Sequence, residues 1–186
     1  MAPTRKQRAL TKLLSLFPTG RLVDLGTGHG NHALLAARLG WEVDGVDART
    51  QRWPDDTSVR WIKADVRDHD LTGYDLILCL GLFYHLTCDD QLDLLSRAHP
   101  RPMIIDTHLD HGTHDHQLSD PVVHNGYQGR LYPEPRATTS SWGNDWSFWP
   151  TFESFHRMLA DSGYSHVLTL EPWMTGDRTF FVALPD

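Results

Sequence analysis

The first half of the chain predicts an α/β domain built around a parallel sheet. Short apolar runs typical of buried strands alternate there with segments of helical periodicity. A glycine-rich turn separates the first such run from a helical segment. At 186 residues the chain is long enough for one domain with a sizeable core. We therefore expect a single domain, residues 1–186, with an N-terminal helix (1–20), a sheet-forming half (21–109), an insert or lid (107–149) and a closing helix with strands (150–186).

Each element of the first half has a local reason. An opening helix at 4–16 places its leucines on one side, and Pro18 and Gly20 end it. A helix at 31–39 follows the glycine turn and stops at Gly40, and Thr87 can cap a short third helix. The connections 51–58 and 68–73 are too short for full helices, so the architecture is trimmed. The expected strands are residues 21–26, 41–48, 59–65, 74–81 (apolar enough to be buried on both faces) and 101–109.

The second half has a different character. Residues 107–149 are polar, aromatic and rich in His, Gly and Pro, with no long periodic element. An insert of this length is usually a functional lid unless it hides short strands, and residues 126–132 suit one arm of a hairpin. Regular pattern returns in a helix at 151–162, ended by Gly163. Two closing antiparallel strands are expected at 166–171 and 178–184.

Composition limits the partners. The formal net charge is −7, with no basic run beyond residues 5–8. The chain is therefore poorly suited to nucleic acid, because neutralised phosphates supply most non-specific affinity. No apolar run approaches the length of a membrane span, so we expect no membrane partner. Cys79 and Cys88 lack the spacing of a metal site, which favours reduced thiols and a cytoplasmic location.

The segment V-D-L-G-T-G-H-G, residues 23–30, has three glycines at alternate positions between a strand and a helix. Such a turn allows a nucleotide-like ligand to approach the backbone closely. A phosphate-binding G-x-x-x-x-G-K-[ST] loop is excluded because its Lys and Ser/Thr are missing. The dinucleotide pattern G-x-G-x-x-G requires a glycine at position 31, where this chain has Asn31; its third glycine, Gly30, comes one residue early.

Acidic residues at the ends of successive strands discriminate further between ligands. Asp24, beside the turn, would repel a pyrophosphate and attract a cation, which argues against a nicotinamide dinucleotide. S-adenosylmethionine is a nucleoside ligand with a sulfonium and an ammonium group but no phosphate. Asp47, about 20 residues beyond the turn, can accept both ribose hydroxyls, and Asp65 ends the third strand, near an adenine amino group. The three acids together favour S-adenosylmethionine as the cofactor.

At these residues the chain resembles the class I S-adenosylmethionine-dependent methyltransferase family, from about residue 21 to residue 109. The resemblance implies a Rossmann-like seven-stranded mixed sheet with flanking helices and an antiparallel last strand. It also implies which residues line the cofactor. Together with Asp24, these are Gly26, Gly28 and Gly30 in the turn, Asp47 at the ribose, Asp65 and Val66 at the adenine, and Gly81, Leu82 and Tyr84 at the methionine portion.

The catalytic residue is the least predictable part of such an enzyme. Methyl transfer is an in-line displacement that depends mostly on positioning, and a base is needed only when the nucleophile must lose a proton. From residue 81 the chain reads G-L-F-Y-H-L, and its His85 either packs at the cofactor or acts as that base. An Asn/Asp-Pro-Pro-Tyr motif, which would hold an exocyclic amine, is missing there.

The segment D-T-H-L-D-H-G-T-H-D-H, residues 106–116, is the second unusual feature. Five of the 12 histidines fall between His108 and His124. One interpretation is a polar loop with solvated imidazoles. Another is a catalytic base, His108 or His111, assisted by Asp106 or Asp110. A third is a metal site with His108, Asp110 and His111 as ligands, but their spacing matches no recognised metal pattern and we assign no metal.

Aromatic side chains are frequent in the insert, interleaved with Arg130 and Arg136, which would suit a carboxylate or phosphate on a substrate. The aromatic residues either close over a small organic acceptor or form a satellite core under the loop. They are Tyr127, Tyr132, Trp142, Trp146, Phe148 and Trp149.

We therefore expect a methyltransferase that uses S-adenosylmethionine on a small-molecule acceptor, at oxygen in preference to nitrogen. One alternative is a different S-adenosylmethionine-dependent modification, or one that acts on tRNA or another nucleic acid. F-Y-H and N-D-W-S-F-W-P-T look faintly like the tRNA wobble-uridine carboxymethyltransferases, but a basic patch is absent. Another alternative is a non-catalytic module that senses the cofactor. The sequence names neither the acceptor nor the oligomeric state.

Overall fold

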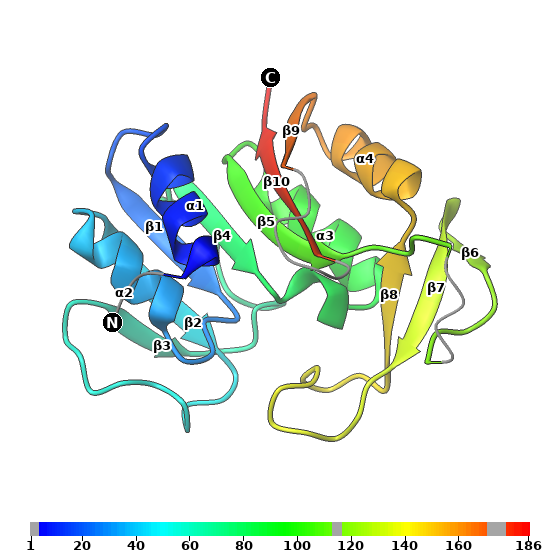
Figure 1. The fold of residues 1–186 in the computed structure, drawn as a ribbon, viewed down its shortest axis with the longest axis horizontal. Helices are drawn as coiled ribbons and strands as arrows, with labels where there is room; N and C mark the ends of the chain where they lie inside the picture. Colours follow the sequence, from blue (N-terminus) through cyan, green and yellow to red (C-terminus); the bar gives the residue numbers. More distant parts are fainter. Residues whose placement is uncertain (1–3, 113–116, 171–177) are drawn as a thin grey trace. The chain divides into compact units, whose positions relative to one another are not determined.

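The structure is a computed structural model that describes residues 4–112, 117–170 and 178–186 (Figure 1). It contains two compact units, Met1–Leu80 and Gly81–Asp186, which are described in turn. None of the helices in the described ranges combines the length and the apolar character that crossing a membrane requires.

The first unit contains the glycine turn and four parallel strands. Helix α1 (Arg5–Leu14) begins with a capping box in which Thr4 and Gln7 exchange hydrogen bonds. Strands β1 (Arg21–Leu25), β2 (Glu42–Asp47), β3 (Arg60–Lys63) and β4 (Leu76–Leu80) pair in parallel in the order β3-β2-β1-β4. Helix α2 (Asn31–Arg38) packs on β1 and β2, and α1 packs on α2 (Figure 1).

The second unit begins with a short 3₁₀ turn, η1 (Phe83–His85), and helix α3 (Cys88–Ala98), which Thr87 caps as expected. Strand β5 (Met103–His108), strand β10 (Arg178–Leu184) and strand β9 (His166–Leu170) lie side by side, with β10 antiparallel to both neighbours. The strand order β3-β2-β1-β4-β5-β10-β9 confirms the Rossmann-like seven-stranded mixed sheet. Residue 171, the expected end of β9, lies outside the described residues.

The insert contains a second sheet. Strands β6 (Val122–His124), β7 (Tyr127–Pro133) and β8 (Trp146–Pro150) pair antiparallel, and helix α4 (Phe152–Asp161) packs against β7 and β8. The hairpin arm expected at 126–132 is β7. A glycine inside β7, Gly129, made the strand hard to predict, because glycine is uncommon within strands. Only glycine fits at this position, since a Cβ would lie 2.3 Å from the Trp149 carbonyl oxygen.

The strands are shorter than expected at their carboxyl ends. The expected strand at 59–65 stops at Lys63, so Asp65 lies in the loop that follows β3 rather than at the strand's last position. Parallel strands end where their hydrogen-bonded partner ends, and β2 pairs with β3 only as far as Asp47 with Lys63. Asp65 is therefore placed by a turn, which depends on its own hydrogen bonds.

Candidate functional site

The glycine turn is held by hydrogen bonds that it makes with its neighbours in the chain. The amide of Gly28 donates to Oδ2 of Asp47 over 2.9 Å, and the amide of Gly30 donates to the Thr27 carbonyl over 2.8 Å. Gly28 and Gly30 have φ values of +54° and +71°, a region that side chains rarely adopt. The sequence pattern thus reflects a backbone requirement at both positions.

Asp24 lies inside this turn. Its side chain is 1% exposed, and Oδ2 accepts a hydrogen bond from the Thr27 hydroxyl over 2.9 Å. Burial raises the pKa of Asp24 to about 7, against the opposing effect of Thr27. A cation bound nearby would favour the ionised form of this carboxyl group.

Asp47 accepts a backbone hydrogen bond on each of its carboxylate oxygens. Oδ2 accepts from the Gly28 amide over 2.9 Å and Oδ1 accepts from the Arg49 amide over 2.8 Å, and the residue is buried. Each carboxylate oxygen has two lone pairs, so both oxygens retain one for a further donor. The two backbone amides therefore fix the orientation of the Asp47 carboxylate.

Asp65 has a partner that the sequence did not indicate. The Arg67 side chain forms two hydrogen bonds with its carboxylate, 3.0 Å to Oδ1 and 2.5 Å to Oδ2, and the Arg67 amide donates to Oδ1. These bonds lower the pKa of Asp65 below its usual value. The predicted contact of Asp65 with adenine therefore has to use the remaining lone pairs of an ion-paired carboxylate, and neighbouring Val66 is buried.

One tryptophan packs against the glycine turn, and a second tryptophan stacks on the first. A Cβ at Gly30 would lie 2.4 Å from the Trp61 ring, and Trp53 stacks on Trp61 with ring centroids 5.7 Å apart. Sequence reasoning left this connection open as a missing helix. Two aromatics around the polar run 54–60 were the only signal for it.

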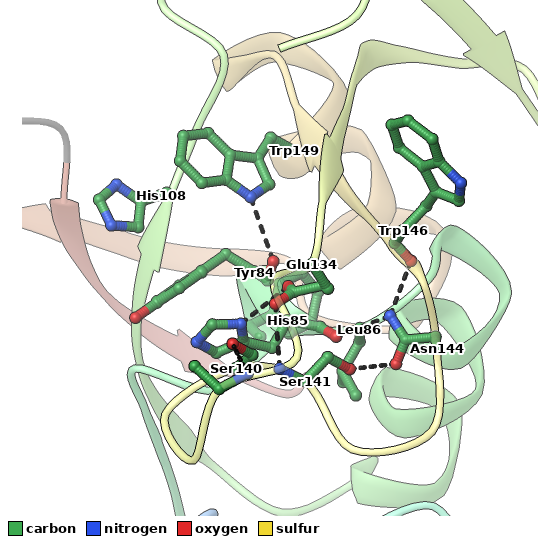
Figure 2. Close-up of polar contacts among 12 residues, drawn as sticks. Tyr84, His85, Leu86, His108, Glu134, Ser140, Ser141, Asn144, Trp146 and Trp149 are labelled. Atoms are coloured by element: carbon green, nitrogen blue, oxygen red, sulfur yellow. Dashed lines mark hydrogen bonds and ion pairs between the residues drawn. The ribbon is translucent and has the colours of Figure 1, made fainter. Parts of the chain in front are cut away.

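In the second unit, three successive backbone carbonyls after Gly81 are held by β8 and the loop before it (Figure 2). The Trp149 indole donates to the carbonyl of Tyr84 over 3.1 Å, and the Asn144 side chain donates to that of His85 over 3.2 Å. The amide of Phe148 donates to the carbonyl of Leu86 over 3.0 Å. The insert therefore fixes the position of this segment.

The side chain of His85 forms a pair with Glu134, which lies just after β7 (Figure 2). Nδ1 of His85 and Oε1 of Glu134 are 2.8 Å apart, and their side chains are 18% and 2% exposed. Burial alone would raise the pKa of Glu134, but hydrogen bonds from His85 and the Ser141 amide lower it below its usual value. No described residue hydrogen-bonds Nε2 of His85. A carboxylate that orients an imidazole with a free second nitrogen is the arrangement of a general base.

His108 is half-buried like His85, but its ring is arranged differently. Its ring stacks on Trp149 with centroids 4.6 Å apart and planes 4° apart. Nε of Arg178 donates to Nε2 of His108 over 3.3 Å, while another nitrogen of this guanidinium lies 3.4 Å from Asp106. Because a guanidinium can only donate, Nε2 of His108 is already engaged as an acceptor, which argues against its use as a base.

Residues 81, 82 and 84, expected at the methionine portion of the cofactor, lie at the start of the second unit. Gly81 has a φ of +84° and donates to the Asp106 carbonyl over 2.9 Å. The hydroxyl of Tyr84 accepts a hydrogen bond from Arg178, and burial raises the Tyr84 pKa despite that cation. Leu82 precedes η1. Their cofactor contacts stay predictions.

The remaining candidate residues of the insert do not form a common site. His111 is exposed, and Asp110, its proposed assistant, is paired with Arg130 over 3.3 Å. Arg130 is therefore a buried structural cation, whereas Arg136 is exposed. His114 and His116 lie outside the described residues. Within the part of the chain that the structure describes, no three metal-ligating side chains are grouped closely enough to hold an ion.

The comparison with family models decides the family. Residues 2–168 match the family described as "Methyltransferase domain". The chain belongs to this family. The resemblance to class I S-adenosylmethionine-dependent methyltransferases is thereby confirmed: the protein is a methyltransferase, and S-adenosylmethionine is its cofactor.

Solved structures share the fold of this methyltransferase. The N-terminal domain of EvdMO1 with S-adenosylhomocysteine bound is 21% identical (TM-score 0.76), covering 97% of this chain and 80% of that one. The Burkholderia thailandensis 1,6-didemethyltoxoflavin-N1-methyltransferase is 18% identical (TM-score 0.67; 97% and 78%). CalS10, an amino pentose methyltransferase from Micromonospora echinaspora, is 18% identical (TM-score 0.64; 97% and 92%). A search of curated protein sequences finds no match.

The residues present in the methyltransferase fit its cofactor. The Asp47 carboxylate retains one lone pair on each oxygen, as a ribose diol requires. At Gly28 an added Cβ would meet only the Arg52 side chain within 4 Å, so no backbone atom closes over this glycine. Asp24 supplies the carboxyl that a sulfonium or ammonium group would keep ionised.

Proposed function

We propose that this methyltransferase methylates a hydroxyl group of a small molecule, with His85 as the general base and Glu134 as its positioning partner. The observation that carries the proposal is the 2.8 Å contact between these two buried or half-buried side chains. S-adenosylmethionine supplies the electrophilic methyl group. The acceptor oxygen forms the new bond to carbon as the carbon–sulfur bond breaks, and the hydroxyl proton passes to Nε2 of His85.

The pair favours oxygen over nitrogen for a chemical reason. A neutral amine attacks a methyl sulfonium without first losing a proton, whereas an alcohol is a weak nucleophile until a base assists it. An ionised Glu134 favours the Nδ1–H form of His85, which leaves Nε2 as the proton acceptor. With a neutral amine as acceptor, the methyl-transfer step itself requires no base.

Several observations support a small acceptor. Among structures of the same fold, one was determined in the presence of D-fucose, one is an amino pentose methyltransferase, and one is a 1,6-didemethyltoxoflavin-N1-methyltransferase. The net charge of −7 disfavours nucleic acid. The loop that holds His85 also presents two indoles to solvent, Trp142 at 53% and Trp146 at 51% exposure, surfaces suited to an aromatic or sugar ring.

The cytoplasmic location stays part of the proposal. Both thiols are buried, and burial raises the pKa of Cys88 to about 12, so it is an inert thiol rather than a reactive one.

The proposal is tested with paired acceptors that differ only in one group, such as a sugar and its amino analogue. The protein is incubated with S-adenosylmethionine, released S-adenosylhomocysteine is quantified, and the methylated atom is located by NMR. We expect an O-methyl product. Methylation of amines alone would contradict the proposal. Binding of S-adenosylmethionine without turnover across the panel would favour the sensing module instead.

A further inference from the structure

The hydroxyl group of Tyr84 carries a proton for which the second unit provides no acceptor among its described residues. The side chain is 7% exposed, and its oxygen accepts a hydrogen bond from Arg178. Because a guanidinium only donates, the phenolic proton of Tyr84 has to bind elsewhere. Burial raises the pKa of Tyr84, so the phenol keeps this proton at neutral pH. Buried donors are nearly always paired, which makes this hydroxyl a candidate for binding a ligand.

The position of the hydroxyl is fixed by its neighbours. The Tyr84 ring lies with its centroid 4.3 Å from that of His85 and 4.5 Å from that of His108. Arg178, which donates to the hydroxyl, also donates to Nε2 of His108. A Cβ at Gly81 would lie 3.8 Å from the hydroxyl oxygen, and Gly81 directly follows β4. The hydroxyl therefore lies at the carboxyl end of a parallel strand, where ligands bind in open α/β sheets.

The proposed base faces the same side as this hydroxyl. In Figure 2 the hydroxyl of Tyr84 and Nε2 of His85 project to the same side of the segment that carries them, away from Glu134. An acceptor that gives its proton to Nε2 of His85 therefore comes close to the Tyr84 O–H group. Arg178 makes this group a stronger donor, because hydrogen bonds in a chain polarise one another. The part of the acceptor that meets it has to offer a lone pair.

We propose that Tyr84 donates a hydrogen bond to a second oxygen of the acceptor, on the carbon next to the hydroxyl that is methylated. Oxygens on adjacent carbons are close enough to bind two side chains that contact each other, as Tyr84 and His85 do. The acceptor then belongs to the vicinal diols and hydroxy ethers, the class that includes sugar rings and catechols. The inference rests on the proposed function, since His85 fixes where the methylated hydroxyl lies.

The test compares acceptors that differ only in the second oxygen: catechol with phenol, and methyl α-D-glucopyranoside with its monodeoxy derivatives. Values of kcat/KM are measured from released S-adenosylhomocysteine for the wild type and for Tyr84→Phe, which keeps the ring and removes the hydroxyl. We expect the wild type to prefer the intact diol about 10- to 100-fold, because its donor is unpaired with the other acceptor. The variant should lose most of this preference but keep its activity on the acceptor with one oxygen fewer, which excludes a folding defect.

Tyr164→Phe is the matched control. It removes the hydroxyl of another buried tyrosine, one that donates to the Arg101 carbonyl, and should leave the preference unchanged. Calorimetry with S-adenosylhomocysteine should give the same affinity for the wild type and Tyr84→Phe. Weaker binding by the variant would mean that the hydroxyl meets the cofactor, and would overturn the inference.

Two further outcomes would also overturn it: a wild type without preference for the diol, or a preference that persists in Tyr84→Phe. A wild type that methylates only amines would instead contradict the proposed function.

Discussion

The glycine turn and the segment Tyr84–Leu86 are held in opposite ways. The turn is fixed by residues within about one strand and one helix of it: Thr27 donates to Asp24, and Asp47 accepts from Gly28. The segment that carries His85 is fixed from far along the chain, by side chains 49 to 65 residues away. One site is self-contained, and the other is assembled by the insert.

Because of this difference, substitutions can change the surroundings of the proposed base and those of the glycine turn independently. Substitutions in the insert can alter the base and its surroundings without touching any hydrogen bond of the glycine turn. Changes in the turn should alter the stability of the first unit and, if the predicted contacts hold, the binding of the cofactor. The following variants test whether the two regions are independent, in order of decreasing expected effect.

Replacement of the proposed base should have the largest effect. We expect His85→Gln to lower kcat on a hydroxyl acceptor about 100- to 1,000-fold, as for loss of a general base, with the Kd of S-adenosylhomocysteine unchanged. Steady-state kinetics and calorimetry measure the two quantities. His111→Gln, an exposed histidine of the insert, is the matched control and should retain full activity. A similar loss in both variants would assign the effect to the fold rather than to the base.

Glu134→Gln should have the next largest effect. The amide keeps the shape of the side chain but no longer favours one tautomer and orientation of His85, so we expect kcat to fall roughly 30-fold, about 2 kcal/mol. A purely structural role would lower activity equally at all pH values. A positioning role should also move the acid limb of the pH–rate profile, because a negative charge is removed beside the base. An unchanged profile would count against the pair.

The glycine turn offers a matched pair of stability variants. At Gly30 an alanine would meet both a positive φ and the Trp61 ring at 2.4 Å, whereas at Gly28 the φ is positive but the nearest atom is 3.8 Å away. We expect Gly28→Ala to cost about 1 kcal/mol and Gly30→Ala about 2 kcal/mol or more. Urea unfolding measures both. Equal costs would mean that Trp61 moves aside freely.

Asp24→Asn should have a small effect that depends on pH. The folded-state pKa of about 7 lies above the usual aspartate value of 3.8, so the unfolded chain ionises first as pH rises. Wild-type stability is therefore highest below about pH 4 and is lost between pH 4 and 7. Relative to wild type, Asp24→Asn should gain roughly 1–2 kcal/mol in unfolding free energy between pH 5 and pH 8. A difference that does not vary with pH would contradict the raised pKa.

The glycine turn could be predicted from the sequence, whereas the contacts made by the insert could not. The turn, its acids and the order of the first strands follow from local patterns, because a left-handed glycine or a helix cap such as Thr87 depends on nearby residues alone. The three-stranded sheet of the insert was hidden because Gly129 occupies the middle of β7 to avoid the Trp149 carbonyl. The length of β3 and the position of the Asp65–Arg67 pair depend on where the hydrogen bonds between β2 and β3 end. The sequence of one strand does not contain that information.

The catalytic candidates show the limit most clearly. The sequence proposed His85, His108 and His111 on residue type, and nothing local distinguishes them. Their partners do: Glu134 engages Nδ1 of His85, and Arg178 engages Nε2 of His108. Both partners lie 49 to 70 residues away, and their contacts exist only in the folded chain.

The most direct test of the central claim compares wild type and His85→Gln on a hydroxyl acceptor and its amine analogue, at a pH where the amine is neutral. Single-turnover rates at saturating S-adenosylmethionine remove differences in cofactor binding and product release. The proposed role predicts a loss of about 100-fold or more on the hydroxyl and little change on the amine, which needs no base. Equal losses on both acceptors, or none on the hydroxyl, would contradict it.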